Sequence, residues 1–179
     1  MTAIERERII APEEMTGYKR SWLLLTAGIL ALIVGFGSIA GGVFGAWYTW
    51  DQAVAQDVVT PDDAVLPGAA VRGPFTMWAQ ADIITHHQLD STEGLYYSQM
   101  PREVPQVDEN GAAVLDGNGE AVMVPNEARA SWMSATTLTT ALGLGILAYA
   151  LSAVAVAVGL TLVFSGFVFL SIRRRAVLL

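Results

Sequence analysis

Two long runs of apolar residues dominate the pattern of hydrophobic and polar positions along the chain. Residues 21–50 and residues 130–172 contain no Asp, Glu, Lys or Arg, and they comprise 30 and 43 residues. A helix needs about 20 apolar residues to cross a bilayer, so each run is long enough to do so. Trp22 opens the first run and Trp47 and Trp50 close it, and rings of this kind favour the headgroup region. The pattern therefore predicts two membrane-spanning helices.

The second run exceeds the length of a single span and leaves two alternatives open. As one helix it would extend about 65 Å, which is about twice the hydrocarbon thickness. Residues 131–140 are rich in hydroxyl groups, whereas residues 141–170 are strongly apolar and contain no Pro, Asn or Asp to form a tight turn. This favours one helix that begins outside the bilayer. Two short spans that form a hairpin are the alternative.

Shorter signals predict the elements between the two runs. The sequence TPDD at 60–63 marks the stop of the first helix, and Pro74 suits the first turn of a helix over about residues 75–89. Apolar arms surround D-G-N-G within residues 112–124, which is typical of a β-hairpin. Asn126 is a candidate N-cap for the last helix. The predicted fold is an all-α membrane protein, a two-helix transmembrane hairpin with a small, mostly helical extracytoplasmic domain that contains a β-hairpin.

Charge predicts the orientation of the two helices. Lys19 and Arg20 precede the first run and three arginines follow the second, whereas residues 51–129 carry 13 acids and three arginines, a net charge of −10 with the histidines neutral. By the positive-inside rule, both termini are cytoplasmic and the protein is a multi-pass protein of the plasma membrane. The predicted segments are a cytoplasmic tail (residues 1–20), transmembrane helix 1 (21–50), an acidic extracytoplasmic domain (51–131), a helix continuing as transmembrane helix 2 (132–172), and a basic cytoplasmic tail (173–179).

Composition narrows the classes of function. Cysteine is absent, which excludes disulfides and thiolate chemistry, and the acidic segment argues against nucleic acid as a partner. Neither predicted span contains an ionisable residue, which argues against a proton relay or an ion pathway. G-x-S-x-G, phosphate-loop and H-E-x-x-H motifs are absent from the sequence. The expected partners are the lipid bilayer and either a partner protein or further copies of the chain.

Three glycines in the first run suggest a helix-packing face. Gly37, Gly41 and Gly45 recur every four residues, so they lie nearly on one side of a helix. Small residues let two backbones approach closely, and such packing drives helix association in lipid. We expect this face to pack against the second span, where Ala148, Ser152, Ala155 and Gly159 are also small, or against another copy or a larger complex.

The stretch ADIITHHQLD at 81–90 holds both histidines and is the candidate chemical site. On a helix, Asp82, His86 and Asp90 share one face, and two carboxylates with an imidazole are ligands for a transition metal. The alternative is a solvated helix face, since His87 points about 100° away from His86. No cofactor is then expected. A calcium loop at residues 116–120 is a further alternative, although a hairpin turn explains the same residues.

Residues 73–100 resemble a group of small actinobacterial two-span membrane proteins. Members carry a similar G-P-F-T, then A-Q-A-D-x-I, then a histidine and a G-x-T-Y-like stretch, which here are Gly73, Pro74, Phe75, Thr76, Ala79, Gln80, Ala81, Asp82, Ile84, His87, Gly94 and Tyr97. The segment 104–124 departs from the group as an insertion, and EGLYYS alters the glycine-rich turn. Members are often labelled aromatic ring-opening dioxygenases, a label that implies iron bound by histidine and carboxylate.

The sequence favours a function without catalysis. We expect an accessory or scaffold subunit whose extracytoplasmic domain docks a partner through a surface made by Phe75, Trp78, Ile83, Ile84, His87 and Tyr97. A metal-dependent enzyme, similar to a ring-opening dioxygenase, or a sensor that uses Asp82, His86 and Asp90 is the alternative.

Overall fold

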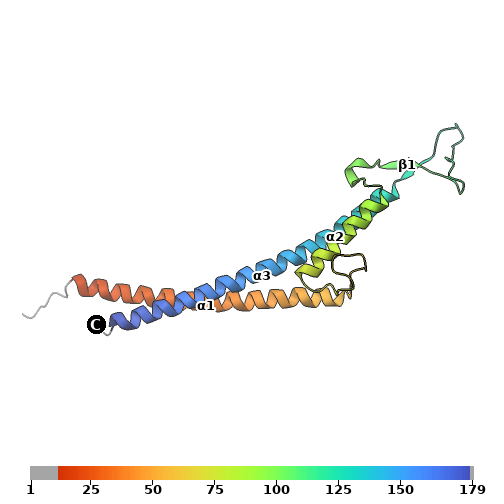
Figure 1. Cartoon of the computed structure of the whole chain (residues 1–179). Coiled ribbons are helices and arrows are strands. Elements are labelled where there is room, and N and C mark those ends of the chain that lie inside the picture. The colour runs from red at the N-terminus through yellow and green to blue at the C-terminus, as the bar shows by residue number, and fades with distance from the viewer. Residues whose placement is uncertain (1–11, 178–179) are drawn as a thin grey trace, which may run out of the picture. The chain divides into compact units, whose positions relative to one another are not determined.

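The computed structural model describes the backbone of residues 12–177 and the side chains of residues 22–175; residues 1–11 and 178–179, which belong to the predicted tails, lie outside it. Helices account for most of the described chain (Figure 1). In chain order the elements are α1 (Pro12–Ala55), α2 (Pro74–Ser91), the 3-10 turn η1 (Tyr97–Gln99), β1 (Glu103–Pro105), β2 (Met123–Pro125) and α3 (Glu127–Val177).

Both long helices are long and apolar enough to cross a membrane, over Trp22–Ala55 in α1 and Glu127–Arg175 in α3. The second apolar run forms one uninterrupted helix, so the alternative of two short spans is wrong. The run contains no Pro, Asn or Asp to form a tight turn, and every backbone group inside a helix is paired within the helix itself. Large apolar side chains such as Leu30 and Phe164 are exposed along both helices, at 62% and 70%.

Local signals set both ends of α2. Pro74 occupies the first turn, and the Thr76 hydroxyl accepts hydrogen bonds from the backbone N–H groups of Arg72 and Gly73 at 3.0 and 3.1 Å. At the other end, the Gly94 N–H donates to the Leu89 carbonyl at 2.8 Å with a φ of +80°, a conformation that glycine adopts without strain. The predicted helix over residues 75–89 is therefore confirmed, and the observed helix is longer by one residue at its start and two at its end.

The two strands form a small antiparallel sheet in which Val104 lies opposite Val124. Beyond them the chain turns at D-G-N-G, where the Asp116 carboxylate accepts hydrogen bonds from the backbone N–H groups of Asn118 and Glu120 at 2.8 and 3.0 Å. These bonds hold the pKa of Asp116 below its usual value. A hairpin turn thus forms where it was predicted, but β1 lies before the predicted segment 112–124 and β2 overlaps only its last two residues. Within that segment Leu115 and Ala121 form an isolated bridge.

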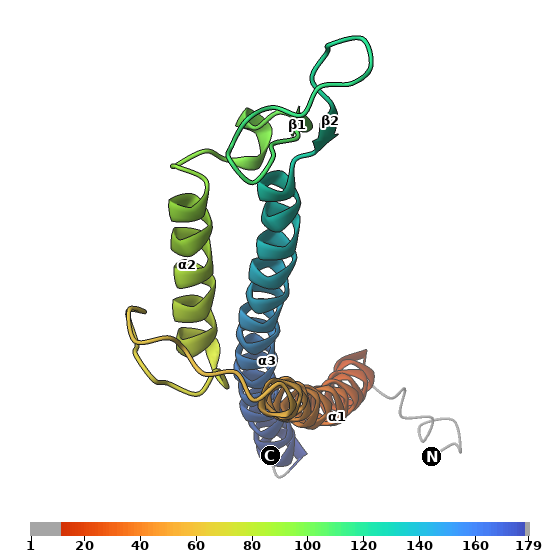
Figure 2. The same cartoon turned by 90° about the vertical axis from the view of Figure 1, so that its right-hand side faces the viewer.

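The chain divides into two compact units. The helix-pair unit comprises Met1–Tyr48 and Ala150–Leu179, and the loop unit comprises Thr49–Tyr149. In the loop unit, α2 lies alongside the first part of α3 (Figure 2). Ala79 and Ile83 of α2 and Trp132 and Ala135 of α3 are buried between them, with exposed fractions of 8% or less.

A seven-residue repeat of small residues brings α1 and α3 together in the helix-pair unit. The helices run antiparallel, and the small residues meet in three pairs. A Cβ placed on Gly28 would lie 3.2 Å from the Gly166 carbonyl oxygen, and a Cβ placed on Gly159 would lie 2.6 Å from the Gly35 carbonyl oxygen. A Cβ placed on Gly42 would lie 2.6 Å from the Ser152 carbonyl oxygen. Contacts this short require glycine, because any side chain would push the backbones apart. A spacing of seven also keeps two helices in contact over several turns.

The face expected to pack on the second span is therefore different from the one observed. A Cβ placed on Gly37 or Gly41 would meet no atom within 4 Å, whereas one on Gly45 would meet the Ser152 hydroxyl of α3 at 2.8 Å. Of the four small residues expected in the second span, Ser152 and Gly159 are buried, while Ala148 and Ala155 are half-buried. Packing of Gly37 and Gly41 against a helix of another chain stays a prediction.

Candidate functional site: an arginine-lined pocket in the loop unit

The predicted metal ligands lie on the exposed side of α2. The Nδ1 atom of His86 is 2.9 Å from the Asp82 carbonyl oxygen and 3.4 Å from its carboxylate Oδ2. Within the part of the chain that the structure describes, no three His, Cys, Asp or Glu side chains come together in a way that suits a metal ion, so Asp90 does not join this pair. Metal binding through these three residues stays a prediction.

His87 instead ties a loop to α2. Its Nε2 atom lies 2.6 Å from Oδ2 of Asp63, a residue 24 positions earlier in the chain. This hydrogen bond holds the pKa of the Asp63 carboxyl below its usual value. The same loop is closed by the buried Thr60, whose hydroxyl bonds the Leu66 carbonyl and accepts from the Ala69 N–H at 2.9 Å. Of the two histidines, His87 is therefore the one that contacts a distant segment.

The contact between Asp63 and His87 predicts a dependence of loop stability on pH. Folding lowers the pKa of Asp63 below 3.8. The contribution of this contact to loop stability is therefore fully present above pH 3.8, and it is lost as the pH falls through the lower pKa of the folded state. We expect His87→Ala to remove this component of acid stability and His86→Ala to preserve it. The rate of proteolysis at residues 61–68, measured from pH 5 to pH 2 in both variants, checks the prediction; equal profiles would contradict it.

The predicted docking surface is divided by the fold. Ile83 is buried against α3 and Ile84 is half-buried, so neither presents a full side chain to a partner. Phe75 and Trp78, at 78% and 51%, are exposed near the start of α2. Tyr97 lies beyond the other end of α2, in η1. These six residues therefore form no single surface.

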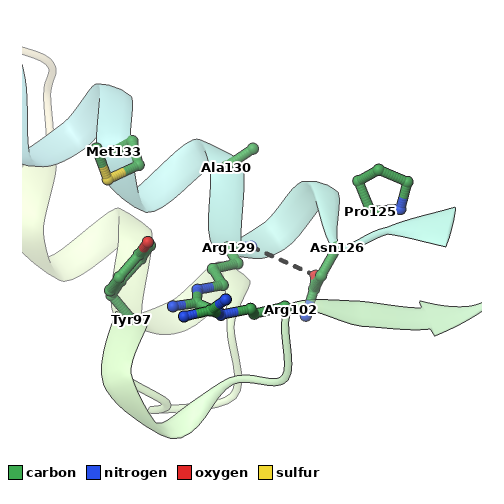
Figure 3. Close-up of a pocket in the computed structure, with 7 residues that line it drawn as sticks. All are labelled: Tyr97, Arg102, Pro125, Asn126, Arg129, Ala130 and Met133. Carbon is green, nitrogen blue, oxygen red and sulfur yellow. Dashed lines mark hydrogen bonds between the residues drawn. The ribbon is translucent and has the colours of Figure 1, made fainter.

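Tyr97 belongs to a pocket that the sequence did not predict. The pocket has a volume of about 310 Å³ and is lined by residues before β1 and around the start of α3 (Figure 3), namely Tyr97, Arg102, Pro125, Asn126, Arg129, Ala130 and Met133. Arg102 and Arg129 are two of the three arginines among residues 51–129. Residues 51–129 contain 13 acidic residues and only three arginines, and two of these arginines line the same pocket.

Asn126 holds the two arginines in place. Its backbone N–H donates to the Arg102 carbonyl at 3.0 Å, and its side-chain amide donates to the Pro101 carbonyl at 3.1 Å. Its side-chain oxygen accepts from the Arg129 N–H at 3.3 Å, which makes it the N-cap of α3, as predicted. One residue therefore joins the chain before β1 to the first turn of α3, and it sets the positions from which both arginine side chains extend.

The two guanidinium groups lack anionic partners. No carboxylate among the described residues forms an ion pair with Arg102 or Arg129. The Arg129 guanidinium carbon lies 4.2 Å from the centre of the Tyr97 ring, and its Nε atom is buried without a hydrogen-bond partner. The positive end of the α3 dipole adds to the same potential. This arrangement suits a carboxylate or another small anion, because guanidinium groups bind such oxygens with paired hydrogen bonds.

The scarcity of arginine between the two long helices is the sequence signal that points to this pocket. Arginines are scarce in a segment of net charge −10, so each one calls for an explanation. Their separation of 27 positions, with the hairpin between them, concealed the fact that they meet.

No protein-family model, no curated protein and no solved structure matches this chain. The resemblance of residues 73–100 to small two-span proteins therefore stays an expectation.

Proposed function

We propose that this chain is a non-enzymatic accessory or scaffold subunit of the plasma membrane that docks a protein partner through its loop unit. In this proposal α1 and α3 cross the bilayer, both termini are cytoplasmic, and the loop unit is extracytoplasmic. The length and apolar surface of both helices and the positions of Lys19, Arg20 and the three terminal arginines support this topology.

The observation that carries the docking function is the pair of unpaired arginines, Arg102 and Arg129, in one pocket. Two neighbouring cations repel each other, and the buried Nε atom of Arg129 lacks an acceptor, so an incoming carboxylate relieves both costs. We infer that the partner presents an acidic side chain or a chain terminus there. Pro125, Ala130 and Met133 form the apolar part of the lining and suit a neighbouring apolar side chain of the partner.

Truncation of either pocket arginine is expected to weaken docking. A charge-assisted hydrogen bond contributes about 1.5–3 kcal/mol, which corresponds to roughly a 10- to 100-fold loss of affinity. A photo-cross-linking side chain at Met133, which lines the pocket and is 56% exposed, would capture the partner in native membranes. We expect Arg102→Ala and Arg129→Ala each to reduce the cross-linked product strongly.

Arg72→Ala is the matched control, because it removes the same charge from the loop unit but lies outside the pocket. It should leave the cross-linked product unchanged. If all three variants reduce it equally, net charge rather than the pocket governs the association. If none reduces it, the docking site lies elsewhere and the proposed function loses its main support.

A further inference from the structure

The first turns of α2 carry two exposed aromatic side chains. Phe75 is 78% exposed and Trp78 is 51% exposed, and residues three apart on a helix lie on the same side. Between them Met77 is buried, at 5%. This part of α2 therefore packs on one side and presents two large rings on another, and an exposed apolar pair of this size calls for an environment that covers it.

The packed side of these turns contacts the apolar run of α3. The Met77 sulfur lies 2.7 Å from the position that a Cβ on Gly145 would take, so the absence of a side chain at Gly145 makes room for Met77. The Tyr149 hydroxyl donates a hydrogen bond to the Arg72 carbonyl at 2.6 Å, just before α2 begins. Gly145 and Tyr149 both belong to the charge-free residues 130–172.

Helix geometry gives the depth of these contacts along α3. Ile172 is the last residue before the basic end, and it precedes Arg173. At 1.5 Å per residue, Tyr149 lies about 35 Å and Gly145 about 40 Å from Ile172 along the helix. A bilayer is about 40–45 Å thick with its headgroups and about 30 Å thick without them. With Ile172 at the inner edge of the hydrocarbon, Tyr149 therefore falls in the outer headgroup layer and Gly145 lies at or just beyond the outer edge of that layer, if α3 crosses as proposed.

We propose that Phe75 and Trp78 insert into the outer headgroup layer of the bilayer and anchor the start of α2 there. The inference rests on the proposed crossing of the membrane by α3. Aromatic side chains favour this layer because their apolar rings and polar edges match its two sides. The occupant of this surface is thus lipid and not a protein partner, and the anchor holds the start of the loop unit at the membrane surface.

The absence of cysteine from the natural sequence permits a direct test with single spin labels. Phe75→Cys, His86→Cys and Leu160→Cys are each labelled with a nitroxide in the full-length protein and reconstituted into phosphatidylcholine–phosphatidylglycerol nanodiscs. Collision rates with oxygen, which concentrates in lipid, and with a water-soluble nickel complex are then measured. His86 is exposed eleven positions farther along α2 and serves as the aqueous reference. Leu160, at 58% exposed, is the hydrocarbon reference.

We expect the nickel collision rate at position 75 to be several-fold lower than at position 86, with the oxygen rate raised. A label at 75 that is as accessible to nickel as the one at 86 would place Phe75 in water and overturn the anchor. Protection from both reagents would mean that protein covers the site, which also overturns it. If the label at 160 is not in hydrocarbon, α3 does not cross the bilayer as proposed. The result at position 160 therefore tests the membrane crossing, and the result at position 75 tests the anchor.

Discussion

Replacing Trp132 with alanine is expected to destabilise the loop unit by about 3–5 kcal/mol, the usual cost of removing a buried aromatic side chain. The Trp132 side chain is 8% exposed, and its indole N–H donates to the Leu95 carbonyl at 3.0 Å. Its ring also lies 5.6 Å from that of Tyr96. The substitution therefore leaves a cavity beneath the turn that follows α2 and removes the donor that holds this turn to α3.

Thermal unfolding of the full chain in mild detergent, followed by near-ultraviolet circular dichroism, measures this effect. Leu138→Ala is the matched control, because Leu138 lies on the same helix but is 54% exposed, and surface substitutions usually change stability by less than about 0.5 kcal/mol. Similar unfolding temperatures for the two variants would contradict the packing role of Trp132.

The second large effect is expected at the contact between α1 and α3. A Cβ on Gly159 would lie 2.6 Å from the Gly35 carbonyl oxygen and 2.9 Å from the Ile39 nitrogen, and neither backbone atom can move independently of its helix. Gly159→Ala must therefore push the helices apart, at a cost of about 1–3 kcal/mol. Gly41→Ala meets no atom within 4 Å, and it should leave the pair intact or stabilise it slightly, since alanine favours helix over glycine.

Unfolding of the helix pair can be followed with dyes on two introduced cysteines, Leu23→Cys and Ile172→Cys. These exposed positions lie five residues before Gly28 and six after Gly166, so they end up near each other when the helices are paired. We expect Gly159→Ala to lower the SDS fraction at which the dyes separate. If Gly41→Ala has the larger effect, the four-residue glycine face and not the seven-residue one holds the two helices together.

Local signals were sufficient for the helices. Pro74 and the turn at Gly94 act within a few residues of the α2 ends, and the lack of Pro, Asn and Asp in 141–170 predicts one continuous α3. The hairpin was predicted only in part, because D-G-N-G determines the turn, whereas strand length depends on pairing between residues about 20 positions apart.

The packing face and the pocket were harder to predict. The four-residue spacing of Gly37, Gly41 and Gly45 is conspicuous in α1 alone, but the choice of face depends on where α3 also has small residues. The pattern that matches the observed face is the spacing of seven shared by small residues of both helices. The pocket required knowledge of Asn126, whose hydrogen bonds bring Arg102 and Arg129 to the same place.

The sequence by itself determined two helices long and apolar enough to span a membrane, an acidic segment between them, and the absence of thiol chemistry. These properties follow from composition and from interactions between near neighbours in the chain. Only the tertiary structure decided that His87 binds Asp63, that glycines spaced by seven form the helix contact, and that two arginines share a pocket without an acid. Each of these depends on short contacts between residues far apart in sequence, which local patterns do not encode.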